Sequence, residues 1–200
     1  PAAGRRTSCG RRSAAAEAGG CALLDAPVTG SKPQAAAGEL TCLVGGSAAA
    51  LATAQPALAA MSRAVVHCGP SGSGALLKLI NNFLCGVQAA SLAEALALIE
   101  RAGLDRDAAL GVLTNGAPGS GIVKGLSPRM VARDYAPNFH LALMAKDLTY
   151  AARAGERHGV GLTTAAPALA AFQRAIAQGQ GDADFSAVIE PMRALRAATP

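Results

Sequence analysis

Apolar side chains recur at intervals of three and four residues over a long stretch of this chain, from residue 75 to residue 101. The stripe begins at Leu76, passes through Phe83 and reaches Ile99. This repeat matches one face of an α-helix, and Gly103 follows at the point where such a helix would end. The sequence therefore predicts one long helix over residues 75–101.

The rest of the chain after this stretch also has a helical pattern. Asp105 is suited to cap a short helix, and a loop rich in Gly, Pro and Ser follows over residues 115–121. Ala and Leu favour helices, and aromatic residues make up only 3% of the sequence, so closely packed helices are expected rather than a β-sandwich. Further helices are predicted at residues 122–133, 141–158, 164–178 and 185–197, the last capped by Asp184.

Residues before position 70 have a different pattern, in which short apolar segments end at turn residues. Ser47 is suited to cap an Ala-rich helix that extends to about residue 63, and Pro56 is expected to kink or break it. Residues 7–20 end in Gly19-Gly20, as a helix often does. Strands that alternate with a helix indicate the end of an α/β sheet, so a domain boundary is expected near residues 70–74. The predicted strands are Cys21–Val28, Leu40–Val44 and Ala64–Cys68.

The formal charge of +5 is concentrated at the start of the chain. Arg5, Arg6, Arg11 and Arg12 lie in a stretch that has no acidic residue, and the rest of the sequence is close to neutral. A basic terminus can bind nucleic acid, but an isolated run of this kind is more often a solvated end. Nucleic acid is therefore the least favoured partner.

The cysteines and the apolar runs indicate the cellular compartment of the protein. The five cysteines form no Cys-x-x-Cys pair and are odd in number, which weighs against a metal site or a disulfide framework and favours free thiols in a reducing compartment. The most apolar run, Phe83–Ile99, is interrupted by Gln88, Ser91 and Glu94, so no membrane helix is expected. A cytoplasmic protein without a metal site is predicted.

The segment Gly72–Asn82 has the most specific chemical pattern. Gly72 and Gly74 allow close backbone approach at a helix start, where unpaired N–H groups and the helix dipole favour an anion. Lys78 and Asn82 are four residues apart and share one helix face, which suits a proton donor beside a hydrogen-bonding amide. From the residues alone, an exposed lysine with an amide that packs between helices is an equally good interpretation.

A second polar segment follows the first predicted strand. The Thr29 hydroxyl and the amides of Gly30 and Ser31 stand at the end of that strand, where α/β sheets bind ligands, and they are suited to hold a carboxylate. From the residues alone, an ordinary surface loop is the stronger interpretation.

A third segment extends from Phe139 to Leu148 and has an apolar stripe of helical spacing. Lys146 and Asp147 lie within it as adjacent opposite charges, and the stronger interpretation from the residues alone is a solvated ion pair.

Taken together, these segments resemble the β-hydroxyacid dehydrogenase family, which includes 3-hydroxyisobutyrate dehydrogenase and relatives of 6-phosphogluconate dehydrogenase. The segments occur in the family's order and spacing, and the resemblance extends from residue 20 to residue 190. Two stretches, Thr29–Gln34 and Gly181–Glu190, resemble most the glyoxylate and succinic semialdehyde reductase branch. The motifs are Asp25-Ala-Pro-Val-Thr-Gly, Gly38-Glu-Leu-Thr with Val44-Gly-Gly, Gly72-x-Gly-x-x-x-Lys78-x-x-Asn-Asn82, and Phe139 with Lys146-Asp-Leu.

The resemblance implies an architecture and an activity. Residues 1–70 would be the end of a Rossmann-type dinucleotide-binding domain, and residues 71–200 an all-helical substrate and dimerisation domain with a long interdomain helix. The implied activity is hydride transfer between NAD or NADP and a small carboxylate-bearing hydroxyacid or its aldehyde or keto acid. The implied assembly is a homodimer or homotetramer, without membrane attachment.

The resemblance also assigns roles to single residues. Lys78 falls on the family's catalytic lysine, and Asn82 falls on a residue that hydrogen-bonds the substrate. The substrate-carboxylate loop corresponds to Thr29, Gly30 and Ser31. The expected cofactor contacts are Lys146, Gly74 and Phe139.

One family motif is not found in this sequence. The Gly-x-Gly-x-x-Gly loop would precede residue 1, so the pyrophosphate contacts and the choice between NAD and NADP are not predicted. The alternative function is therefore a non-catalytic helical module for oligomerisation or binding.

Overall fold

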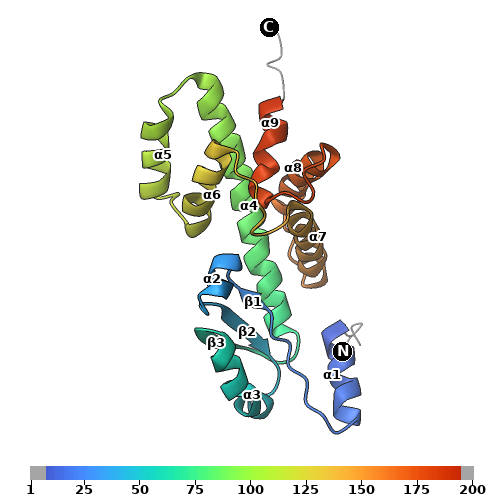
Figure 1. Ribbon diagram of the computed structural model, residues 1–200. Coiled ribbons are helices and arrows are strands. Elements are labelled where there is room, and N and C mark those ends of the chain that lie inside the picture. The colour runs from blue at the N-terminus through green and yellow to red at the C-terminus, as the bar shows by residue number, and fades with distance from the viewer. Residues whose placement is uncertain (1–7, 195–200) are drawn as a thin grey trace. The chain divides into compact units, whose positions relative to one another are not determined.

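The computed structural model describes residues 8–194 (Figure 1). It divides the chain into two units, residues 1–80 and residues 81–200, and the long helix α4 (Ser73–Ala102) has residues in both. Arg5 and Arg6, and the last residues of the predicted helix 185–197, lie outside the described residues.

A three-stranded sheet lies in the first unit, in the order β1 (Val28–Thr29), β2 (Thr41–Gly45) and β3 (Ala64–Gly69). Strands β2 and β3 are parallel, and helix α3 (Ala48–Met61) connects them. Parallel neighbours need such a crossover, because a tight turn joins only antiparallel strands. β1 pairs with β2 in the antiparallel direction. The expected end of an α/β sheet is therefore present.

The first predicted strand, Cys21–Val28, is mostly wrong. Only Val28–Thr29 is a regular strand, and Cys21 is exposed rather than buried. Asp25 still pairs with Gly45 in an isolated bridge that has the register of β1 and β2. Pro27 interrupts the ladder because it has no N–H to donate, although its carbonyl accepts from Leu43.

Local capping explains the other elements of this unit. Ser47 accepts a hydrogen bond from Ala50 N at 3.2 Å and begins α3, as predicted, with Pro56 inside the helix. The predicted helix before Gly19 is α1 (Ser8–Ala18). A short helix, α2 (Lys32–Ala36), was not predicted, because five residues are too few to show a helical repeat.

The second unit consists of helices, and their bounds agree with the predictions to within a few residues. They are α4, α5 (Arg106–Asn115), α6 (Gly121–Ala132), α7 (Leu141–Arg157), α8 (Ala165–Ala177), the 3₁₀ helix η1 (Phe185–Ile189) and α9 (Glu190–Ala194). The caps at Asp105 and Asp184 are confirmed, since they accept from Ala108 N and Ser186 N. The single helix predicted for 185–197 is instead η1 followed by α9.

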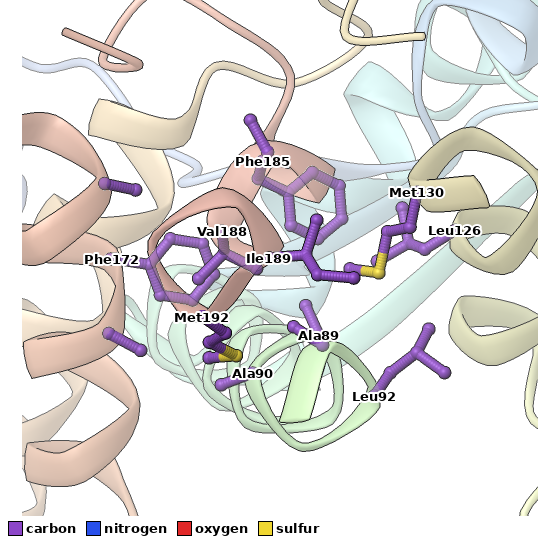
Figure 2. Packing of buried hydrophobic residues seen from close by; sticks show 14 of the residues in the cluster. Ala89, Ala90, Leu92, Leu126, Met130, Phe172, Phe185, Val188, Ile189 and Met192 are labelled. Atoms are coloured by element: carbon purple, nitrogen blue, oxygen red, sulfur yellow. The ribbon is translucent and has the colours of Figure 1, made fainter. Parts of the chain in front are cut away.

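The core of this unit is built around the buried face of α4. Ala89 and Ala93 are fully buried and let neighbouring helices approach closely. Phe172, Val188 and Ile189 belong to the same buried cluster, and Figure 2 shows them together with Ala89.

Helix α4 is also long and apolar enough to cross a membrane by length and composition. However, half of its most apolar window is buried within the protein. A core helix meets the same criterion, and the packing in Figure 2 accounts for the apolar composition.

Candidate active site

The start of helix α4 is occupied by a carboxylate of the protein itself. Asp25 Oδ1 accepts from Gly72 N at 2.6 Å, and Oδ2 accepts from Ala75 N at 2.8 Å. The prediction that the amides at this helix start bind an external anion is therefore wrong for these two amides. The sequence signal for Asp25 is indirect: Gly72 precedes the helix and has no side chain to cap it.

Gly74 has a structural reason to be glycine. A Cβ at this position would lie 2.2 Å from the Leu43 carbonyl oxygen and 2.9 Å from that of Asp25. Both are backbone atoms that cannot move aside. The glycine therefore lets α4 lie directly against the segment that contains Asp25 and against β2, while its predicted contact with the cofactor stays a prediction.

Lys78 lies one turn further along α4 and is partly buried. It belongs to the same unit as Thr29, the last residue of β1. Gly30 follows with φ of 119°, and a Cβ there would lie 2.7 Å from Leu40 Cδ2. Backbone conformation and space both require glycine at this turn.

The third residue of the predicted carboxylate loop, Ser31, has a different local role. Its amide and its hydroxyl both donate to Oε1 of Gln34, at 2.9 and 2.7 Å. This is the reach-back contact of a capping box, and it begins α2. The Ser31 amide is thus used within the loop rather than presented to a ligand, which leaves Thr29 and Gly30 as the predicted carboxylate contacts.

In the second unit, Asn82 is 5% exposed and both ends of its amide are paired. Its Nδ2 donates to Asp147 Oδ2 at 2.6 Å, and its Oδ1 accepts from Asn81 Nδ2 at 3.0 Å. The amide of Asn82 therefore connects α4 to α7, and its contact with the substrate stays a prediction.

Lys146 and Asp147 form the expected ion pair, at 3.2 Å. Their surroundings differ, because the Lys146 side chain is 48% exposed whereas that of Asp147 is 13% exposed. The Lys146 ammonium also lies 5.9 Å from the centre of the Tyr150 ring. The sequence gives Asp147 no role beyond this ion pair, and its burial and its hydrogen bond from Asn82 distinguish it from a solvated partner.

Phe139 lies in the turn before α7 and packs edge-to-face on Phe185, with ring centres 5.9 Å apart. The buried carboxylate of Asp184 holds this turn, because its Oδ2 accepts from the amides of Asn138 and Phe139. The sequence predicted Asp184 only as a helix cap. It therefore has a second function, which is to fix the backbone that carries Phe139.

The helical unit also contains a charged cluster of Tyr135, Glu190, Arg193 and Glu100. Tyr135 and Arg193 both donate to Glu190, and Arg193 also donates to Glu100. The hydrogen bonds from Arg193 lower the pKa of Glu100. Burial raises the pKa of Tyr135, and its hydrogen bond to Glu190 raises it further. These groups join α4, η1–α9 and the loop after α6, and none is a predicted site residue.

A cavity of about 1010 Å³ lies in the first unit. Its lining includes Glu17, Cys21, Ser47, His67 and Ser71, and none of the predicted site residues. The residues predicted to carry the chemistry therefore do not line this cavity, and the candidate site is defined by those residues rather than by the cavity.

Comparison with known protein families shows which family the chain belongs to. Residues 72–192 match the model described as NAD-binding of NADP-dependent 3-hydroxyisobutyrate dehydrogenase. The chain belongs to the β-hydroxyacid dehydrogenase family. Residues 5–69 match the NAD binding domain of 6-phosphogluconate dehydrogenase, so the family resemblance begins earlier than residue 20. Both models describe NAD-binding domains, and NAD or NADP is the cofactor of the family.

Individual members of the β-hydroxyacid dehydrogenase family agree with this assignment. NAD-dependent L-serine dehydrogenase of Pseudomonas aeruginosa is 36% identical over 91% of this chain and 63% of its own length. Glyoxylate/succinic semialdehyde reductase 1 of Arabidopsis thaliana is 36% identical over 86% of this chain and 59% of its own length. The chain thus spans about 60% of these relatives.

A solved structure of the family gives the same fold. Mycobacterium tuberculosis 3-hydroxyisobutyrate dehydrogenase, solved with L-serine, is 34% identical and superposes with a TM-score of 0.85. The match covers 93% of this chain and 66% of that protein. The predicted fold class, an α/β remnant followed by an all-helical domain, is confirmed.

Proposed function

We propose that this chain is part of an NAD(P)-dependent oxidoreductase that transfers a hydride between a nicotinamide and a small β-hydroxyacid or its aldehyde or keto acid. The observation that carries the proposal is the attachment of α4 to the segment before β1. Through Asp25, the helix that carries Lys78 is fastened to the segment that ends at Thr29 and Gly30.

Lys78 is the proposed proton donor and acceptor. When a carbonyl compound is reduced, negative charge develops on its oxygen, and a lysine ammonium stabilises that charge and donates a proton. In the reverse direction the neutral amine accepts the proton of the hydroxyl group. General acid–base catalysis of this kind typically contributes about 10²–10⁴-fold to the rate.

Thr29 and Gly30 are proposed to bind the substrate carboxylate, through the hydroxyl group and the backbone amide. Asn82 is proposed to orient the substrate hydroxyl. This requires a rearrangement of its amide, because Asn82 is paired with Asp147 in this structure. Branch membership with the glyoxylate and succinic semialdehyde reductases is supported by the similarity to the Arabidopsis enzyme.

The residues of the helical unit fit a dinucleotide. The Lys146 ammonium is half-exposed and paired with the adjacent Asp147, so it can approach an anionic group. Phe139 is proposed to contact the cofactor from a backbone segment that Asp184 holds in place. A bound nicotinamide supplies the hydride or takes it up.

The proposed assembly is a homodimer or homotetramer in the cytoplasm. Half of the most apolar window of α4 is buried within the protein, which supports a core helix rather than a membrane helix. Light scattering on the purified protein would measure the assembly directly.

The second candidate function is a non-catalytic module for oligomerisation or binding. Helix α3 favours it, since its sequence is mainly apolar and yet it has no buried residue. Met61 is 60% exposed and Val66 is 43% exposed in the same unit. An apolar face of this kind suits association with another protein surface.

Turnover separates the two functions. The protein at its natural full length is assayed with NADH and NADPH, or their oxidised forms, on 3-hydroxyisobutyrate, L-serine, glyoxylate and succinic semialdehyde. Lys78→Ala should reduce turnover by about 10²–10⁴-fold and leave cofactor binding intact. Lys124→Ala, on the exposed face of α6, should leave both unchanged. Normal turnover by Lys78→Ala would refute the role of Lys78, and cofactor binding without turnover on any of these compounds would favour the binding module.

A further inference from the structure

Asp25 is held from two directions within the first unit. Its carboxylate accepts from Gly72 N and Ala75 N at the start of α4. Its backbone exchanges two hydrogen bonds with Gly45 of β2, at 3.0 and 2.8 Å. A Cβ on Gly45 would lie 2.5 Å from Asp25 Oδ1, so the carboxylate fills the space that this glycine leaves. One residue therefore joins the sheet to the helix.

The start of α4 depends on this contact because it has no local cap. Gly72 immediately precedes the helix, has φ of 96° and lacks a side chain that could accept from the first amides. Asp25 supplies the acceptor from 47 and 50 residues away in the sequence. A carboxylate also has the charge that the positive end of the helix dipole favours.

The same contact connects the two predicted parts of the reaction site in this unit. On the sheet side, the pairing of Asp25 with Gly45 continues in one register to Thr29 with Thr41. On the helix side, Ala75 precedes Lys78 by three residues, about 4.5 Å along the helix axis. Asp25 thus fixes the helical turn that leads to Lys78, both in its position along the helix axis and in its rotation about that axis.

We propose that Asp25 is a positioning residue for the reaction: by holding Gly72 and Ala75, it orients Lys78 toward the oxygen of a substrate bound at Thr29 and Gly30. Asp25 does not touch the substrate and acts only through the lysine. This inference rests on the proposed function of Lys78.

Asp25→Asn tests the proposal, because the amide has the size of the carboxylate but loses its charge and one of its acceptors. We expect kcat to fall by roughly 10²-fold, the cost of a misplacement of about 1 Å, while the KM for the cofactor stays unchanged. Asp105→Asn is the matched control, since Asp105 caps α5 through Ala108 N at 2.7 Å. Its kcat should be that of the parent protein.

A double variant shows whether Asp25 acts through Lys78. If it does, Lys78→Ala with Asp25→Asn has the same residual kcat as Lys78→Ala alone, because the oriented group is already gone. A further loss of similar size in the double variant overturns the proposal, because Asp25 would then act on something other than the lysine. If turnover is reduced in Lys78→Ala but normal in Asp25→Asn, this inference alone is overturned. If turnover is normal in Lys78→Ala, the proposed function is refuted and this inference with it.

Circular dichroism and thermal unfolding accompany each assay. Asp25→Ser is the second variant, because a serine hydroxyl also accepts hydrogen bonds at helix starts. If both Asp25 variants lack a cooperative unfolding transition while Asp105→Asn retains one, Asp25 is required for folding and the positioning role is refuted. A folded Asp25 variant with reduced kcat and an unchanged KM for the cofactor supports the proposal.

Discussion

The side-chain amide of Asn82 donates a hydrogen bond to Asp147 over 2.6 Å and so connects the buried faces of α4 and α7. Asp147 in turn pairs with Lys146 through its other oxygen, at 3.2 Å. Asn82, the predicted substrate residue of the helical unit, and Lys146, one of its two predicted cofactor residues, are therefore linked through one carboxylate. That carboxylate was not predicted to have a role.

Replacement of Asn82 by alanine should destabilise the helical unit. The substitution leaves Oδ2 of the mostly buried Asp147 carboxylate without the Asn82 donor, and a lost partner of a buried polar group costs about 1–3 kcal/mol. The free energy of unfolding in urea measures the effect. Asn115→Ala is the control, since Asn115 is exposed and its side chain donates to Gly111 O of its own helix. Equal small effects of the two variants would contradict the structural role of Asn82.

Two glycines in helices should respond to alanine in opposite ways. Gly74→Ala places a Cβ 2.2 Å from the Leu43 carbonyl oxygen, so we expect a loss of about 1–3 kcal/mol in the free energy of unfolding. Gly125 lies inside α6 with nothing within 4 Å of its Cβ position. Gly125→Ala should therefore stabilise the protein by about 0.5–1 kcal/mol, because alanine is the better helix former. Thermal unfolding of both variants measures the difference, and a stabilising Gly74→Ala would show that α4 does not contact β2 as described.

The helices were predictable because their signals are local. The apolar repeat in α4, the caps at Ser47 and Asp105 and the glycine after residue 102 each involve residues within one or two turns. The two-residue strand β1 was not predictable to its bounds, because its extent depends on pairing with β2. Local sequence patterns do not indicate with which distant segment a strand will pair.

The site was predictable in its residue types but not in its contacts. Lys78 and Asn82 stand out from their spacing on an apolar helix. Asp25 and Asp147 do not stand out, because the amide groups that donate hydrogen bonds to them lie 47 to 65 residues away in the sequence. Ser31 shows the opposite case, since a donor predicted for a ligand is used by Gln34 three residues later.

Acid should weaken the protein through Glu100. Hydrogen bonds from Arg193 lower the pKa of Glu100 below its ordinary value of 4.5. The stabilisation is fully present above the pKa of the unfolded chain and is lost as the pH falls through the lower pKa of the folded state. Glu100→Gln should therefore reduce the stability at neutral pH and flatten its decline below pH 4.5, as urea unfolding at several pH values would measure. Glu94→Gln, on an exposed part of the same helix, is the control, and an equally steep acid decline in Glu100→Gln would contradict the role of the Arg193 contact.

Alkaline pH should weaken the protein through Tyr135. Burial, followed by the hydrogen bond to Glu190, raises the pKa of Tyr135 above its ordinary value of 10.0. Above that value the unfolded chain loses the phenol proton while the folded chain keeps it, so stability falls as the pH rises. Tyr135→Phe removes this alkaline decline but also removes the donor to Glu190, so it should be less stable than the parent at neutral pH. The ultraviolet absorbance of the phenolate gives an independent measurement, because the parent should show a late-titrating tyrosine that Tyr135→Phe lacks and Tyr150→Phe retains. A late phase that persists in Tyr135→Phe would place the raised pKa on another residue.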